Sequence, residues 1–316
     1  MPGSESNACA LVFIHLGPTI PSYTALALAQ ARLFNRMPIF LVASATALSN
    51  FPLESALAIE RVSCESLPVS VSHEHFEQTS TLDRVFRNGF WTYTTERFFY
   101  LKALMHARDL ERVFYLENDV TLYVDLESLL PVFTRYYQHI AATFDNDDRC
   151  IPGFLFVRHA HPLAPLTNFI AKFFDRSGRA INDMALIAGY RKVYGAAAID
   201  LLPIVPPNPA HPLGSQAAHR PADPALYSNF IEDFDSIFDA AALGQYLGGA
   251  DPLNSGGKET VGFINASCVF NPSHYEFTAQ IDALGRSIPF LHTPDRNYRI
   301  NRSLHIHSKN LAEYIS

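Results

Sequence analysis

The stretch RVFYLENDVTLYVD, residues 112–125, changes from apolar to acidic in its middle. Apolar residues at 113–116 precede Glu117, Asn118 and Asp119, and apolar residues then return. An uninterrupted apolar run of this length is typical of a strand that is buried on both faces of a sheet. Alternate residues of an extended chain point to the same side, so Glu117 and Asp119 can reach one common point. The stretch therefore predicts a buried strand that ends on two carboxylates.

The rest of the chain alternates between short apolar runs and segments with helical periodicity. This alternation predicts an α/β fold, a Rossmann-like and mostly parallel sheet with helices on both faces. The expected strands are 11–16, 38–44, 60–70, 112–116, 139–144, 153–157 and 199–207, with later strand segments at 262–270, 288–294 and 303–309. The expected helices are 23–35, 94–111 with Thr94 or Thr95 as N-cap, 125–137 broken near Pro131, 166–174, 182–195 and 236–249.

The composition limits the class of protein. The chain has 316 residues, of which 48% are hydrophobic and 17% charged, enough apolar side chains for a packed core. A formal charge of −7 without a basic stripe argues against nucleic acid as a partner and fits an anionic membrane surface poorly. We expect no signal peptide and no transmembrane segment, because the start lacks a basic region and apolar runs are short. Four cysteines without a CxxC pair indicate a reduced, cytoplasmic protein.

Two carboxylates at the end of a parallel strand suit a ligand site, because ligands bind beyond the carboxyl ends of such strands. Hard carboxylate oxygens suit Mg²⁺ or Mn²⁺, either of which can neutralise a diphosphate. The spacing alone is common, and helix caps and charged loops use it as well. Asp145/Asp147 also follows an apolar strand, so this pair remains the alternative metal site. The acid-x-acid spacing recurs at Asp125/Glu127, Asp145/Asp147 and Asp233/Asp235.

Five segments in order, TERFFYLKALM (95–105), RVFYLEND (112–119), GFLFVR (153–158), NDMALI (182–187) and LHIHSKNL (304–311), resemble the layout of GT-A fold glycosyltransferases. The resemblance covers roughly residues 11–204 and the C-terminal tail. In that family a DxD or ExD motif binds a divalent metal and the diphosphate of a nucleotide sugar. This sequence has Glu first in the motif, a known variation, and lacks an obvious acid after the second strand to hold a uracil.

The resemblance implies a set of metal and donor residues. The tail of such enzymes brings a histidine to the metal and a lysine to the diphosphate. We expect His307 as the ligand in preference to His305, because it lies beside Ser308 and Lys309. An imidazole beside two carboxylates favours Mn²⁺ over Mg²⁺. The expected metal ligands are Glu117, Asp119 and His307, and the expected donor-binding residues are His15, Leu16, Gly17, Ser44, Arg97, Asn118 and Lys309.

For inversion, glycosyl transfer also needs a base at the acceptor hydroxyl. Asp183 matches the position of an acceptor-side carboxylate in related enzymes, although it or Asn182 could equally cap the helix at 182–195. Asp239 is the second candidate, since burial among small apolar residues can raise the pKa of a carboxyl group. A retaining enzyme would need no such base.

The sequence thus predicts a metal-dependent glycosyltransferase of the hexosyltransferase type that takes part in glycan synthesis. Residues 1–206 would bind the nucleotide-sugar donor, a UDP- or GDP-sugar, and residues 207–316 would complete the acceptor side of the same compact domain. The expected acceptor is a glycan or another hydroxyl compound. Two other classes stay open: a metal-dependent nucleotidyltransferase or phosphohydrolase, and a non-catalytic carbohydrate-binding protein.

Overall fold

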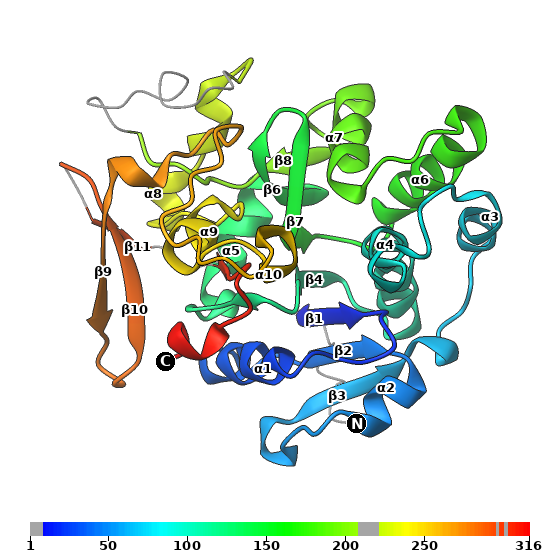
Figure 1. Ribbon diagram of the computed structural model, residues 1–316, viewed down its shortest axis with the longest axis horizontal. Coiled ribbons are helices and arrows are strands. Elements are labelled where there is room, and N and C mark those ends of the chain that lie inside the picture. The colour runs from blue at the N-terminus through cyan, green and yellow to red at the C-terminus, as the bar shows by residue number, and fades with distance from the viewer. Residues whose placement is uncertain (1–8, 208–220, 295–296, 300–302) are drawn as a thin grey trace.

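The computed structural model describes residues 9–207, 221–294, 297–299 and 303–316. Its centre is a seven-stranded sheet flanked by helices (Figure 1). In spatial order the strands are β3 (Ile59–Ser63), β2 (Ile39–Ala43), β1 (Cys9–His15), β4 (Arg112–Leu116), β7 (Arg149–Val157), β6 (Ile140–Asn146) and β8 (Ile199–Leu201).

The sheet is mostly parallel. Strands β3, β2, β1 and β4 run in one direction, and β6 and β8 also pair in parallel. Strand β7 is the exception, since it pairs antiparallel with both β4 and β6. All five residues of β2 are buried, as expected for a strand with covered faces. The predicted fold class is therefore confirmed.

Two groups of helices flank the sheet. Helices α3, α4, α6 and α7 pack against one another, and α5, α8 and α9 lie on the other side of the view (Figure 1). The helices are α1 (Tyr23–Phe34), α2 (Ala45–Asn50), α3 (Val71–Thr79), α4 (Phe90–Ala107), α5 (Leu126–Tyr136), α6 (Leu163–Ser177), α7 (Asp183–Tyr194), α8 (Ile231–Phe234), α9 (Ala242–Gly248) and α10 (Pro252–Ser255). Among the described residues, none of these helices has both the length and the apolar character needed to cross a membrane.

Helix α4 begins at Phe90, earlier than the predicted Thr94 or Thr95 cap. Its N-cap is Gly89, whose φ of 89° lies in the left-handed region that glycine adopts most easily. Thr95 instead lies inside the helix and donates its hydroxyl to the carbonyl oxygen of Trp91 at 2.9 Å. The predicted cap was wrong because a left-handed glycine can start a helix without a polar side chain.

Helix α5 runs on across Pro131, so the predicted break is wrong. Asp125 caps this helix as expected, accepting from the backbone N–H of Glu127 at 3.0 Å. Pro131 lacks an N–H and leaves the carbonyl of Glu127 without its helical donor. Both residues are exposed, so water can satisfy that carbonyl and the helix can continue.

Helix α9 begins at Ala242, six residues later than the 236–249 segment predicted. Asp239 precedes it in a buried irregular segment and accepts from the backbone N–H groups of Leu243 and Gly244. Strand β8 also ends early, at Leu201, in place of the predicted end near residue 207.

The C-terminal part adds a three-stranded antiparallel sheet and a returning tail. The small sheet consists of β9 (Glu276–Ile281), β10 (Ser287–His292) and β11 (Asn297–Arg299). The tail forms β12 (Leu304–His305), which pairs antiparallel with β5 (Val120–Thr121), directly after the ENDV turn. The division at residue 206 remains a prediction, and this pairing ties the later part to the earlier one.

Candidate active site

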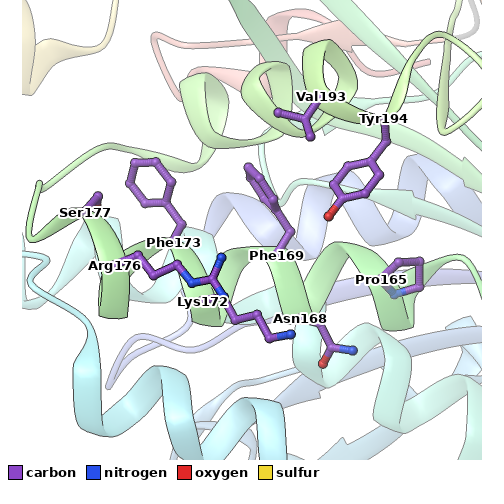
Figure 2. A pocket seen from close by; sticks show the side chains of 9 residues that line it. All are labelled: Pro165, Asn168, Phe169, Lys172, Phe173, Arg176, Ser177, Val193 and Tyr194. Atoms are coloured by element: carbon purple, nitrogen blue, oxygen red, sulfur yellow. The ribbon is translucent and has the colours of Figure 1, made fainter.

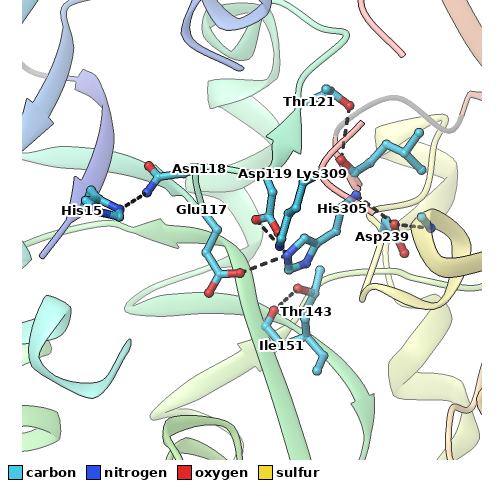
Figure 3. A network of polar contacts seen from close by, with 12 residues as sticks. His15, Glu117, Asn118, Asp119, Thr121, Thr143, Ile151, Asp239, His305 and Lys309 are labelled. Carbon is cyan, nitrogen blue, oxygen red and sulfur yellow. Dashed lines mark hydrogen bonds and ion pairs between the residues drawn. The ribbon is translucent and has the colours of Figure 1, made fainter. Parts of the chain in front are cut away.

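The site lies where the order of the strands reverses. From β1 the chain moves outward to β2 and β3, and then returns to place β4 on the other side of β1. Such a switch point leaves a crevice beyond the carboxyl ends of the two central strands. His15 ends β1, and Glu117 follows β4. The two strand ends are joined by a hydrogen bond between Asn118 Nδ2 and His15 Nδ1, 3.1 Å apart (Figure 3).

The returning tail brings a histidine to the acids. In the β12–β5 pair, His305 lies opposite Val120 and Leu304 opposite Thr121. The backbone N–H of Ile306 donates to the carbonyl oxygen of Asp119 at 2.9 Å. Because Val120 follows Asp119 directly, this pairing fixes His305 beside the acidic turn.

Glu117, Asp119 and His305 converge on one point (Figure 3). His305 Nε2 lies 3.1 Å from a carboxylate oxygen of Glu117 and 3.1 Å from one of Asp119. One ligand atom from each residue lies within 4.8 Å of the others. Asp119 and His305 are buried, whereas the Glu117 side chain is 21% exposed and opens the cluster to solvent.

This donor set fits a divalent metal. Two carboxylate oxygens and one imidazole nitrogen suit Mn²⁺ and related ions. Burial opposes protonation of His305, but Asp119 and Glu117 raise its pKa to about 10. Burial likewise opposes ionisation of Glu117, yet Arg97 and His305 lower its pKa to about 2. A ligating imidazole must be neutral, so a metal bound here would replace the proton on His305.

Lys309 supplies a positive charge at the edge of the cluster. Its ammonium group pairs with Asp119 and lies 5.8 Å from the centre of the Tyr23 ring. Burial opposes the charged form, but Asp119 and Tyr23 raise the pKa of Lys309 above its usual value. Lys309 has a φ of 65°, and its backbone N–H donates to Ile306 O at 3.0 Å. The expected donor-binding lysine thus lies at the acidic turn.

Arg97 on α4 is buried and links two acids. Its guanidinium pairs with Glu117, and its Nη2 lies 2.6 Å from Asp183 Oδ2. Nη1 also donates to the Tyr115 hydroxyl at 3.1 Å. Arg97, expected at the donor, therefore orients the carboxylate of Glu117 through an ion pair.

Asp183, the first candidate base, is the first residue of α7 and is only 2% exposed. Asn182 caps this helix, with its side chain accepting from Ala185 N at 3.0 Å, so Asp183 is not needed as the cap. Burial raises the pKa of Asp183, and Arg97 acts in the opposite direction. The carboxylate therefore lies behind Glu117, joined to it through Arg97.

Asp239, the second candidate base, anchors the tail. Its carboxylate accepts three backbone N–H groups: Leu243 at 3.0 Å, Gly244 at 2.8 Å and His305 at 3.0 Å. These bonds stabilise the charged form, but burial has the larger effect and raises the pKa of Asp239, as the sequence analysis expected. Both carboxylate oxygens are nevertheless engaged by backbone N–H groups. The geometry favours a role in positioning His305 over a role in proton transfer.

His307, the expected metal ligand, lies beside the cluster. The structure brings His305 against the acids, and the ring centre of His307 is 4.3 Å from that of His305. His307 Nε2 is buried and has no hydrogen-bond partner. Burial and the charge of His305 lower the pKa of His307 to about 3. The preference for His307 rested on its position beside Ser308 and Lys309, whereas the pairing of β12 with β5 places His305 at the acids.

The remaining expected donor residues border the same crevice or serve local structure. Leu16 and Gly17 follow β1, and a β-carbon on Gly17 would lie 2.7 Å from His15 Nε2. Ser44 follows β2 and caps α2, accepting from Ala47 N at 3.1 Å. The Ser44 hydroxyl is thus already engaged by the protein.

Two glycines that the sequence analysis did not single out make room for His305. A β-carbon on Gly153 of β7 would lie 2.7 Å from His305 Nδ1. A β-carbon on Gly244 would overlap the carbonyl oxygen of His305 and lie within 2.5 Å of its carbonyl carbon. Each glycine belongs to an element that is distant in sequence from the tail, so spacing gives no signal of this close approach.

The alternative acid pair lies at the end of β6, with Asp145 inside the strand and Asp147 just after it, and has other partners. Asp145 is buried and pairs with Arg149, whose Nε donates to it at 2.7 Å. Asp147 accepts from the hydroxyl of Tyr227 and the backbone N–H of Ala222, both at 2.7 Å. Among the described residues, the metal-ligating clusters of three do not include this pair.

A surface groove lies elsewhere, between α6 and α7 (Figure 2), with a volume of about 670 Å³. It lies towards the end of α7 at Tyr194, about 17 Å along the helix from Asp183. None of the expected site residues lines it. Its lining residues are Pro165, Asn168, Phe169, Lys172, Phe173, Arg176, Ser177, Val193 and Tyr194.

Comparison of the chain with known proteins gives distant structural likenesses only. No family model matches the sequence, and no curated protein matches it. Mouse xyloside xylosyltransferase 1 in its apo form is 10% identical with a TM-score of 0.43, over 62% of this chain and 84% of that one. The galactosyltransferase LgtC, in complex with donor and acceptor sugar analogues, is 12% identical with a TM-score of 0.40, over 69% and 81%. The functional argument therefore rests on the residues of the site.

Proposed function

We propose that this protein is a divalent-metal-dependent glycosyltransferase that moves a sugar from a nucleotide-diphosphate sugar to an acceptor hydroxyl. The observation that supports this most is the convergence of Glu117, Asp119 and His305 at the switch point of the sheet, with Lys309 beside them. Carboxylates, imidazole and ammonium at one point suit a metal–diphosphate group, because they supply both the metal ligands and an extra positive charge.

Each residue of the cluster has a definite task in the proposed reaction. Glu117, Asp119 and His305 hold the ion, Mn²⁺ or Mg²⁺, which when bound neutralises charge on the departing nucleoside diphosphate. Lys309 binds the diphosphate from the other side of Asp119. Arg97 keeps Glu117 ionised and oriented, and Asp239 holds the backbone of His305.

Donor and acceptor occupy opposite sides of the cluster in this proposal. His15, Leu16, Gly17 and Asn118 border the crevice on the donor side, within residues 1–206, and a UDP- or GDP-sugar is the proposed donor. Residues 207–316 complete the acceptor side for a glycan or another hydroxyl compound. Asp183 is the proposed base for an inverting reaction, because burial raises its pKa and Arg97 joins it to Glu117 of the metal-ligating cluster.

A thermal-shift panel of UDP-, GDP-, CMP- and dTDP-sugars, with and without Mn²⁺, tests the proposal. A ligand that binds the native state raises the free energy of unfolding by mass action, by about 2.7 kcal/mol at 100 times its Kd, and so raises the melting temperature. We expect one nucleotide class to raise the melting temperature only with Mn²⁺. Metal-dependent breakdown of a nucleoside triphosphate without a sugar acceptor would identify a nucleotidyltransferase or hydrolase. No metal-dependent shift with any nucleotide would indicate a carbohydrate-binding protein without this activity.

A further inference from the structure

A second cluster of metal-ligating side chains lies between α3 and α4, outside the candidate active site. It consists of His73, Glu77 and Glu96, each with one ligand atom within 4.8 Å of the others. We propose that this cluster binds a divalent transition-metal ion of the zinc type and joins the two helices.

The helical geometry places the three residues together. His73 and Glu77 are four residues apart on α3 and so lie on the same face, one turn from each other. Glu96 reaches them from α4, and His73 Nε2 is 2.9 Å from Glu96 Oε1. A tetrahedral ion with bonds of about 2.1 Å separates its ligand atoms by about 3.4 Å, so only small side-chain movements are needed.

A cavity at the cluster offers room and a further oxygen. Its volume is about 280 Å³, and Glu77, Thr92 and Glu96 are among the residues that line it. The Thr92 side chain is four residues before Glu96 on the same helix face, and the residue is only 8% exposed. Its Oγ1 is buried without a hydrogen-bond partner. A buried hydroxyl of this kind costs about 1–3 kcal/mol when unpaired, which an ion or its bound water would relieve.

The neighbouring groups suit a cation. His73 is buried and stacks on Phe99, with ring centres 4.9 Å apart, so its imidazole is held in place. Arg84 is the positively charged side chain among the residues that line the cavity. It is exposed and donates to the backbone carbonyl of Glu77 at 2.8 Å. One imidazole and two carboxylates are ligands that zinc accepts readily.

An ion at this site would act on α4 next to the candidate active site. Glu96 precedes Arg97, the residue that pairs with both Glu117 and Asp183. Holding Glu96 against α3 therefore restrains the turn of α4 that carries Arg97. The site is structural in this proposal and takes no part in the transfer reaction.

Equilibrium dialysis of the full chain against Zn²⁺, with metal analysis of the dialysed protein, tests the proposal. Glu77→Gln removes a ligand, whereas Glu74→Gln removes the same charge from an exposed position on α3 and serves as the matched control. At a Zn²⁺ concentration that just saturates the wild type, we expect Glu77→Gln to bind about one ion fewer per chain than Glu74→Gln. Both should melt at the same temperature with a chelator present.

A further variant separates this site from the active site. Asp119→Asn disrupts the active-site cluster and should still bind one Zn²⁺ that Glu77→Gln in the same background loses. Equal binding by the Glu77 and Glu74 variants, or no binding by Asp119→Asn, would overturn the proposal. Neither outcome depends on whether the chain transfers a sugar.

Discussion

Two acidic pairs with the same spacing end two strands of one sheet, and they have different partners. Glu117 and Asp119 follow β4, where His305 and Lys309 from the tail join them. Asp145, the last residue but one of β6, pairs with Arg149, while Asp147 accepts hydrogen bonds from Tyr227 and Ala222. In sequence the two pairs look alike, since each follows an apolar strand.

The difference teaches that the partners of a carboxylate decide its role. Arg149 comes from the same hairpin as Asp145, so that pairing is local and needs no ligand. The partners of Glu117 and Asp119 include a second metal-ligating atom type, the imidazole nitrogen of His305, from a segment more than 180 residues away. The imidazole of His305 adds a nitrogen ligand to the first pair, whereas the guanidinium, hydroxyl and backbone N–H that pair with Asp145 and Asp147 add no imidazole or carboxylate ligand.

The largest expected effect is the difference between two variants, one in each acidic pair. We expect Asp119→Asn to abolish the Mn²⁺-dependent shift with nucleotide sugar and to lower the transfer rate about 1000-fold or more, because metal stabilisation of a leaving group is worth several kcal/mol. Asp147→Asn should leave both unchanged. Calorimetry and a donor-consumption assay measure the two effects.

Circular dichroism should show both variants folded. A normal metal-dependent shift in Asp119→Asn, together with its loss in Asp147→Asn, would reassign the metal to the second pair.

The next largest effect concerns two buried aspartates that each pair with an arginine, Asp183 with Arg97 and Asp145 with Arg149. Asp183→Asn should keep donor binding and lower the turnover rate about 100-fold, since a general base contributes at least that factor. The matched variant Asp145→Asn also loses a charge beside an arginine and should lower stability with transfer intact. Donor affinity and turnover are measured separately for each.

If Asp183→Asn turns over at the wild-type rate, Asp183 is not the base, and its role is limited to the ion pair with Arg97. A fall in donor affinity without a change in turnover would place its role in positioning Arg97 and Glu117.

The smallest effect is on the free energy of unfolding and concerns Gly244, which leaves space for His305 of the tail. Gly244→Ala should lower the free energy of unfolding by about 2 kcal/mol, because its β-carbon overlaps the His305 carbonyl and overpacking costs about 1–3 kcal/mol. Gly189→Ala in α7 is the control, since nothing lies within 4 Å of its β-carbon. That change should stabilise the protein by about 0.5–1 kcal/mol. Denaturant unfolding measures both, and a stabilised Gly244→Ala would show that the tail does not pack as described.

The sheet was the most predictable part of the molecule. Apolar runs that must be buried on both faces identified β1, β2, β4, β6 and β7, and periodicity identified α1, α4, α5, α6 and α7. The short helices α2 and α3 were not predicted, and the strand predicted at 262–270 is absent. Other errors came at element ends. Gly89 starts α4 without a polar cap, and Asp239 delays the start of α9 by accepting N–H groups from its first turn. Such ends depend on single backbone conformations and contacts that periodicity does not report.

The part of the site formed by residues close together in the sequence was predictable. The sequence by itself determined the acidic strand end, because the apolar run and the Glu-x-Asp spacing place Glu117 and Asp119 beyond β4 whatever the rest of the chain does. Only the tertiary structure decided that His305 meets them, that Asp239 holds the tail and that Arg97 joins Glu117 to Asp183. The physical reason is that strand register and close packing against Gly153 and Gly244 are set by contacts between distant segments.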